Sequence, residues 1–435
     1  MDFPLFVKDT LTSIISDMAL NPQLFVKDPK KDFIRNRKLK FDSVINLLLS
    51  MGGNSLGKEL LDYFNYDPET ASTSAFVQQR GKILPSAFKH LLDKFTGSFD
   101  NLKTHKGYRL LAVDGSDFHI YHNPNDAETY FNSYHQNGKG YNLIHLNAMY
   151  DLCNKLYIDA CIQPRKKINE YKSLCDMVDN SSLQEKVLVI ADRGYESFNV
   201  FAHIEQKGWK YVIRVKDTTS RGILSNLNLP KTGEFDENIR LILTNKSSKE
   251  IRSNPQTYRV IPSKSAFNFF ELKQTEYIPI EFRVVRFKTC EDNYQTVITN
   301  VAASEFSSSE IKHIYHLRWG IETSFRELKY VIGLNYFHSK KVEHIYQEVF
   351  ARLVMYNFCE LITLHVIIKQ KATKYGYQAN FTLAIQVCKY FFRCGASPPD
   401  VETLIKKNIS PIREGRTDQR KIKQRTAVSF NYRVA

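Results

Sequence analysis

The chain has 435 residues, 43% of them apolar and 13% aromatic, so it is expected to fold into two or three structural units. Its 61 lysines and arginines exceed its 46 acids and give a formal net charge of +15. A surplus of this size suggests a polyanionic partner, either nucleic acid or an anionic membrane. No apolar run is long enough to span a membrane, and seven cysteines without a C-x-x-C pair are typical of a reduced, cytosolic protein.

The positive charge is concentrated in two segments. Residues 27–40 hold seven Lys/Arg against two Asp, a net +5, and residues 402–435 hold nine Lys/Arg against three acids, a net +6. Together they account for 11 of the 15 surplus charges. For either segment alone, a solvated surface is a fair alternative to a nucleic-acid contact.

Residues 1–105 are expected to be helical. Residues 41–51 (FDSVINLLLSM) have apolar side chains at helical spacing, and residues 52–54 (GGN) interrupt the pattern. Ser55 can cap a second helix over residues 56–64. Two helices joined by a Gly-containing turn are compatible with a DNA-binding helix-turn-helix, although an ordinary helical hairpin has the same pattern.

From Arg109 onward the sequence alternates between strand-like and helical segments. The predicted elements, in order, are a strand over 109–114, two strands within 142–164 joined by a turn at 151–154, a helix over 169–180, a strand over 186–192, a helix over 197–208 and a strand over 209–216. Three strands followed by alternating helices and strands predict a mixed α/β sheet with helices on its faces.

Two aspartates stand where strands of this sheet are expected to end. Asp114 closes the apolar run LLAV, with Gly115 and Ser116 as turn residues, and Asp192 closes VLVIA. Sites of α/β sheets lie at the carboxyl ends of strands, although an acid after a strand is also a common turn residue. Asp117 is interpreted as a turn or supporting residue because it lies beyond the apolar run.

Residues 217–300 contain strand-like segments separated by polar turns, and no helix is predicted among them. They are interpreted as an all-β insertion. Two long helices are predicted to follow, over about 307–332 and about 342–370, and then a further helical segment and the basic tail.

The segment YHLRWGIETSFRELK lies in the first of these two helices. Ser307 and Glu310 fit a capping box at its start. At about 100° per residue, four polar side chains fall within about 60° of arc beside the apolar stripe, namely Tyr315, Arg318, Glu322 and Lys329. One interpretation is a half-exposed face on which Arg318 and Glu322 form a salt bridge worth roughly 0.2–0.5 kcal/mol.

The other interpretation is a metal site. Mg²⁺ prefers oxygen ligands, and three carboxylates from separate elements, here Asp114, Asp192 and Glu322, can hold two such ions. Two metal ions can activate the attacking oxygen and stabilise the leaving oxygen in phosphoryl transfer. Arginine, lysine and tyrosine on the same helix face suit contacts with backbone phosphates.

At this helix the sequence resembles a known family. Tyr315, Arg318, Glu322 and Lys329 match the Y-x-x-R-x-x-x-E-x-x-x-x-x-x-K signature of DDE transposases from bacterial insertion sequences, in the cut-and-paste group called YREK. VDGS, which contains Asp114, resembles the family's first aspartate motif, and IADRGY, which contains Asp192, resembles the second. The resemblance extends over most of the chain.

The resemblance implies an RNase H-like catalytic core in which Asp114, Asp192 and Glu322 bind two Mg²⁺ ions, with Mn²⁺ as a substitute. It implies that Tyr315, Arg318 and Lys329 contact DNA. The expected activity is binding of terminal inverted repeats followed by DNA cleavage and strand transfer. The expected partners are double-stranded transposon ends, target DNA and a second copy of the chain in a synaptic complex. No membrane or nucleotide cofactor is expected, and the expected location is the bacterial cytoplasm, at the nucleoid when DNA is bound.

The predicted division of the chain has five parts. They are a helical DNA-binding region (1–105), the first part of the RNase H-like core (106–216), the β insertion (217–300), the last part of the core with the Glu322 helix (301–340), and a C-terminal helical region with the basic tail (341–435). Two other functions remain open: a transposase-derived DNA-binding protein without catalysis, and an RNase H-like nuclease that cuts DNA without joining it.

Overall fold

A computed structural model describes residues 2–35, 37–100, 102–132, 140–271, 274–290, 293–368, 376–395 and 398–412. Most of the C-terminal basic segment, from residue 413 onward, therefore lies outside the described residues. Among the described residues, no helix is both long and apolar enough to cross a membrane.

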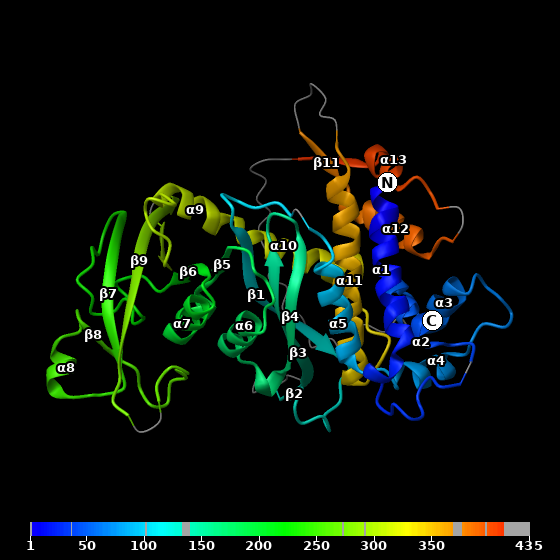
Figure 1. The fold of residues 1–435 in the computed structure, drawn as a ribbon, viewed down its shortest axis with the longest axis horizontal. Helices are drawn as coiled ribbons and strands as arrows, with labels where there is room; N and C mark the ends of the chain where they lie inside the picture. Colours follow the sequence, from blue (N-terminus) through cyan, green and yellow to red (C-terminus); the bar gives the residue numbers. More distant parts are fainter. Residues whose placement is uncertain are drawn as a thin grey trace.

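One ten-stranded mixed sheet extends from the middle of the molecule to the end formed by β7 and β8, on the left in Figure 1. Its strands are ordered β2-β3-β1-β5-β6-β10-β9-β7-β8, and β4 also pairs with β3. The first six strands along the chain are β1 (Arg109–Ile120), β2 (Tyr130–Phe131), β3 (Tyr141–Asp151), β4 (Leu156–Pro164), β5 (Val187–Ala191) and β6 (Lys210–Val215). The other four are β7 (Phe235–Thr244), β8 (Tyr258–Val260), β9 (Tyr277–Cys290) and β10 (Asn293–Thr299).

The half of the sheet that contains β1 has the predicted RNase H-like arrangement. β3 is antiparallel to β1 and to β4, whereas β5 is parallel to β1 and β6 is parallel to β5. Helices α6 (Glu170–Asp179) and α7 (Phe198–Gln206) pack on one face of these strands. Helices α9 (Ser308–Leu317), α10 (Trp319–Glu327) and α11 (Val342–His365) pack on the other. The mixed α/β fold predicted from the sequence is thus confirmed.

The predicted end of the first strand is wrong. β1 does not stop at Asp114 but continues to Ile120, and Gly115 and Ser116 are strand residues rather than turn residues. The reason is the antiparallel partner, because β3 pairs with β1 without interruption from Asp151 to Asn142. What ends near Asp114 is the parallel pairing with β5.

The strands predicted as an insertion extend the same sheet. β10 is antiparallel to β6 and to β9, and β9 is antiparallel to β7. A short helix, α8 (Lys249–Ser253), lies between β7 and β8 where none was predicted. Ser248 caps it by accepting a hydrogen bond from the backbone N–H of Ile251.

The N-terminal and C-terminal helices pack together at the end of the molecule opposite to β7 and β8, on the right in Figure 1. They are α1 (Phe3–Leu20), α2 (Phe41–Ser50), α3 (Leu56–Tyr63), α4 (Thr73–Arg80), α5 (Pro85–Thr96), α12 (Phe381–Arg393) and α13 (Val401–Lys407). A two-stranded sheet of β11 (Tyr377–Ala379) and β12 (Ile409–Pro411) accompanies them. Both helices expected around the Gly52 turn are present, as α2 and α3, but all six apolar side chains of α2 are buried in the core around α11.

A buried ionic network fastens the N-terminal helices to α11. Nη1 of Arg80 lies 2.8 Å from Oε1 of Glu348, and these side chains are 0% and 2% exposed. The backbone N–H of His338, in the loop before α11, donates to Oε2 of Glu348 over 2.9 Å. Arg352 donates from Nη2 to the carbonyl of Gly52 over 2.8 Å. The bonds from Arg80 and Arg352 join segments that are more than 250 residues apart in the chain.

Candidate active site

The sheet register brings Asp114 and Asp192 to the same level. Val113 is opposite Ala191 in the parallel pairing of β1 with β5. Asp114 follows Val113 on β1, and Asp192 follows Ala191, the last residue of β5. Oδ1 of Asp192 accepts a hydrogen bond from the backbone N–H of Gly194 over 2.7 Å. Oδ1 of Asp114 accepts one from the backbone N–H of Gly115 over 2.9 Å.

The third acid, Glu322, lies in the first turn of α10. The capping box of Ser307 and Glu310 begins α9 as predicted. Arg318 joins α9 to α10 with helical backbone angles (φ −49°, ψ −34°), and a π-helix over Leu328–Ile332 follows α10. The predicted apolar stripe is largely buried. Leu317 is half-buried, and the other five side chains are buried, namely Ile314, Ile321, Phe325, Leu328 and Ile332.

Arg318 lies between two of the three carboxylates. Its Nη2 donates to Oε1 of Glu322 over 2.9 Å, and its Nη1 lies 3.8 Å from Oδ2 of Asp114. Burial raises the pKa of Asp114 to about 6; Gly115 and Arg318 lower it, and Asp192 and Glu322 raise it further. The charges of both other acids thus act on Asp114. The predicted salt bridge between Arg318 and Glu322 is present.

The three side chains offer the ligand type that a hard divalent cation requires. All their donor atoms are carboxylate oxygens on three different elements, which suits Mg²⁺. Within the described ranges, no three His, Cys, Asp or Glu side chains are grouped closely enough to hold a metal ion. Because the guanidinium of Arg318 separates Glu322 from Asp114, metal binding would require this cation to move aside.

The interpretation as a half-exposed polar face does not hold for two of its four residues. Tyr315 is only 3% exposed and Arg318 only 5%. The ring of Tyr315 packs near that of Phe287, with centroids 6.4 Å apart, because β9 and β10 cover this part of α9. Over the residues that the structure describes, Oη of Tyr315 and Nε of Arg318 are buried without a hydrogen-bond partner.

The fourth residue, Lys329, reaches β1 beyond the carboxylates. Its Nζ donates to the backbone carbonyl of Asp117 over 3.0 Å and lies 4.6 Å from the ring centroid of Phe118. The structure thus brings Arg318 next to Asp114 and Glu322, whereas Lys329 contacts the strand that carries Asp114.

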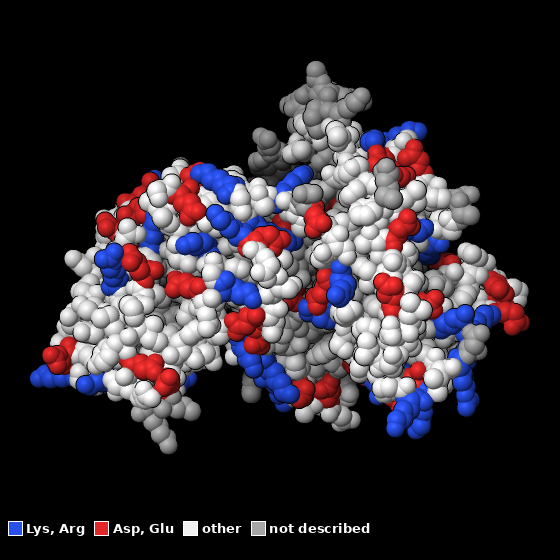
Figure 2. Space-filling model, in the orientation of Figure 1, with Lys and Arg blue, Asp and Glu red and all other residues white. Residues whose placement is uncertain are grey.

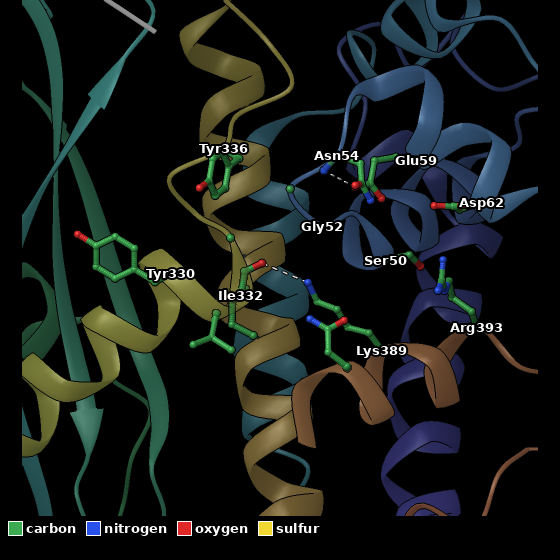
Figure 3. Close-up of a pocket in the computed structure, with 14 residues that line it drawn as sticks. Ser50, Gly52, Asn54, Glu59, Asp62, Tyr330, Ile332, Tyr336, Lys389 and Arg393 are labelled. Atoms are coloured by element: carbon green, nitrogen blue, oxygen red, sulfur yellow. Dashed lines mark hydrogen bonds between the residues drawn. The ribbon is translucent and has the colours of Figure 1, made fainter. Parts of the chain in front are cut away.

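The far end of this helical segment is held by a buried lysine (Figure 3). Nζ of Lys389, on α12, donates to the carbonyl of Ile332 over 3.1 Å and lies 3.4 Å from the carbonyl of Met51. Gly333 then turns the chain with a positive φ of 96°, which glycine adopts without strain. A polar pocket of about 400 Å³ lies beside this junction and is lined by residues of α3, α12 and the Gly52–Asn54 turn.

Two polar residues near the acids were missed by the sequence interpretation. His145 and Glu170 lie beside Gly115, and His145 is also hydrogen-bonded to Asp117. Only the pairing of β1 with β3 places Asp117 opposite His145, so the linear sequence contained no usable signal for this contact.

The comparison with protein families decides to which family this site belongs. The model of the family described as Transposase DDE domain matches residues 105–358, more than half of the chain. The chain belongs to this family. The resemblance to DDE transposases that the sequence predicted is therefore confirmed, whereas membership of the YREK group stays a prediction.

All three acids of the candidate site lie within the range matched by the transposase family. Membership implies phosphodiester cleavage and transesterification. No curated protein matches the sequence of this transposase. Among solved structures, a piggyBac transposase in a synaptic complex with hairpin DNA matches with 9% identity and a TM-score of 0.46, over 94% of this chain and 82% of that chain.

Proposed function

We propose that this transposase binds the terminal inverted repeats of an insertion sequence and catalyses metal-dependent cleavage and strand transfer in cut-and-paste transposition. The observation that carries the proposal is that Asp114 and Asp192 stand at the same level where β5 ends and that Arg318 links Asp114 to Glu322. These acids come from two strands and a helix that the hydrophobic core holds in place, as a preorganised site requires.

The three carboxylates are the residues that would hold two Mg²⁺ ions, with Mn²⁺ as a substitute. Ions bound there would activate the attacking oxygen and stabilise the leaving oxygen. For this to occur Glu322 must release Arg318. The guanidinium of Arg318 and the hydroxyl of Tyr315 contain buried polar atoms without partners, which phosphate oxygens of bound DNA would satisfy. Lys329 supplies a further positive charge for the DNA backbone.

The rest of the double-stranded end is assigned to the basic segment 27–40. All seven of its lysines and arginines are exposed. Figure 2 shows basic side chains projecting at the lower right of the molecule, near the N-terminal helices, while acidic and basic side chains are interspersed over most of the visible face. Because two ends must be brought together, we propose a homodimer as the synaptic form.

The substitution Glu322→Gln tests the catalytic assignment. It keeps the shape of the side chain but removes its charge, so Mg²⁺-dependent cleavage of the element's end should be abolished while binding of the end in a gel-shift assay is retained. Glu327→Gln is the matched control on the same helix, because Glu327 accepts a hydrogen bond from Tyr356 and lies away from the three acids. Full cleavage by the Glu322 variant would contradict the assignment.

The other functions predict different results in the same assays. If the protein binds DNA without catalysis, the wild-type chain itself would bind the ends but would not cleave them. A nuclease would cleave them without joining the released ends to target DNA. Cleavage followed by joining of both ends is the result expected for a transposase.

A triple substitution tests the role of the basic segment. Replacing Lys30, Lys31 and Arg35 with glutamine should weaken end binding. It should also make the slope of log affinity against log salt concentration shallower by about 0.9 for each DNA phosphate that the variant no longer neutralises. A matched triple substitution with glutamine at three exposed lysines of the β-rich half, Lys231, Lys249 and Lys264, should leave both quantities unchanged. Equal effects of the two triple substitutions would contradict the placement of the DNA.

A further inference from the structure

A second charged cluster lies beside the three acids, on the opposite face of β1. His145 on β3 is directly opposite Asp117 on β1, and its Nδ1 lies 2.6 Å from Oδ1 of Asp117. Its Nε2 lies 3.1 Å from Oε1 of Glu170, the first residue of α6. The imidazole is only 9% exposed. Although burial acts in the opposite direction, hydrogen bonds to the two carboxylates raise the pKa of His145 to about 9.

Two glycines leave the space that the carboxylate of Glu170 occupies. A methyl group on Gly115 would lie 2.3 Å from Nε2 of His145 and 2.6 Å from Oε1 of Glu170. A methyl group on Gly194 would lie 3.3 Å from Oε2 of Glu170 and 2.8 Å from Oδ1 of Asp192. Both oxygens therefore lie close to the same point, the position of a methyl carbon on Gly194. Oε2 of Glu170 and Oδ1 of Asp192 can thus be at most about 6 Å apart.

The pKa of Tyr195 responds to the charges of both groups of acids. Tyr195 is 1% exposed, and burial, followed by the charges of Glu170, Asp114 and Asp192, raises its pKa, while Arg318 lowers it. Arg318, whose Nη1 and Nη2 lie against Asp114 and Glu322, also carries one of the two orphaned polar atoms described above, on Nε. Glu170 is therefore close to the acids of the candidate active site even though it enters from the α6 face of the sheet.

We propose that Glu170 is a fourth carboxylate of the catalytic site, which helps to hold a divalent cation, and that His145 and Asp117 are its positioning residues. This inference rests on the proposed function of Asp114 and Asp192. Oε1 of Glu170 is fixed by the imidazole, and Oε2 is turned toward Gly194 and Asp192. A hydrogen-bonded partner that orients a ligating carboxylate is a common feature of metal sites.

The test measures metal binding directly. The affinity of the full-length chain for Mn²⁺, in the absence of DNA, is determined by electron paramagnetic resonance of the free ion. Glu170→Gln should weaken Mn²⁺ binding on the order of tenfold or more, and should raise the Mg²⁺ concentration that gives half-maximal end cleavage. Glu185→Gln is the matched control, because this glutamate is 52% exposed and pairs with Arg109 away from the acids. Wild-type affinity in the Glu170 variant would overturn the proposal.

Two substitutions of His145 separate positioning from general stability. Glutamine places its amide nitrogen near the position of Nε2 and can still donate to Glu170, so His145→Gln should retain most of the Mn²⁺ affinity. Asparagine can reach only the position of Nδ1 near Asp117, so His145→Asn should weaken Mn²⁺ binding. Equal effects of the two variants on metal affinity would overturn the assignment of His145 as a positioning residue.

Gly115→Ala provides a second route if Glu170→Gln does not fold. It retains every carboxylate but pushes His145 and Glu170 aside, so it should also weaken Mn²⁺ binding; unchanged binding would overturn the proposal. Asp114→Asn distinguishes a failure of the role assigned to Glu170 from a failure of the proposed metal site as a whole. If Asp114→Asn weakens Mn²⁺ binding and Glu170→Gln does not, only the role of Glu170 is refuted. If neither does, the metal site of the proposed function is refuted as well.

Discussion

Replacing Glu348 with glutamine should destabilise the protein by about 3 kcal/mol at pH 7. Glu348 is 2% exposed, and although burial acts in the opposite direction, Arg80 and His338 lower its pKa to about 2. Its ordinary value is 4.5. Because a tenfold change in proton affinity corresponds to about 1.4 kcal/mol, this difference amounts to about 3 kcal/mol. The result agrees with the roughly 3–5 kcal/mol lost when one partner of a buried ion pair is removed.

The dependence on pH has a definite sign. Since the pKa of Glu348 is lower in the folded chain than in the unfolded chain, its contribution is fully present above about pH 4.5 and is lost as the pH falls toward about 2. The difference between the variant and the wild-type protein should therefore be constant from pH 5 to pH 8 and narrow below about pH 4.5.

Urea unfolding followed by circular dichroism measures this difference. The matched control is Glu343→Gln on the same helix, because Glu343 pairs with Lys27 over 2.7 Å and both side chains are exposed, by 36% and 42%. Such a surface pair contributes at most about 1 kcal/mol. A loss for Glu348→Gln no larger than that for the control would refute the conclusion that a buried ionic network fastens the N-terminal helices to α11.

Three other substitutions have outcomes that follow from buried charges. Arg318→Gln removes a charged hydrogen-bond partner of Glu322 and a positive charge beside Asp114, so it should lower the free energy of unfolding in EDTA on the order of 2 kcal/mol. Thermal unfolding should then show a larger Mg²⁺-induced stabilisation than in the wild-type protein, and an equal stabilisation would contradict this. Burial raises the pKa of Glu360 to about 8, so ionisation costs stability as the pH rises from about 4.5 to 8. The free energy of unfolding of Glu360→Gln, measured with urea, should exceed that of the wild-type protein by about 5 kcal/mol at pH 9 and equal it below pH 4.5. A difference that does not depend on pH would argue against a buried neutral acid. Burial lowers the pKa of Lys389 to about 7. The free energy of unfolding of the wild-type chain should therefore rise between about pH 7 and pH 10 relative to that of Lys389→Met. If the two proteins show parallel dependences of this free energy on pH, the effect is excluded.

The sequence predicted most elements of the sheet because their signals are local. The apolar strand before Asp192, the turn between β3 and β4 and the capping box at Ser307 all depend on neighbouring residues. The end of β1 was predicted incorrectly for the complementary reason. Gly115 resembles a turn residue locally, but pairing with β3, whose residues are more than 25 positions away, keeps it in the strand.

The Glu322 helix shows the same division between local and long-range information. Helical periodicity correctly placed its apolar stripe on the core. It could not indicate that β9 and β10 cover Tyr315, because burial depends on what packs against a helix face and not on the spacing within it. The strands of residues 217–300 likewise have local strand signals, whereas their addition to the edge of β6 is a long-range pairing.

By itself the sequence determined the mixed α/β class, the resemblance to DDE transposases and the three acids that are candidates for catalysis, since these rest on residue identity and short-range spacing. Only the tertiary structure decided that Arg318 lies between Asp114 and Glu322, and that His145 orients Glu170 toward Asp192 from the other face of the sheet. The physical reason is that charges separated by tens to hundreds of residues interact only after strand register and core packing have brought them within a few ångströms.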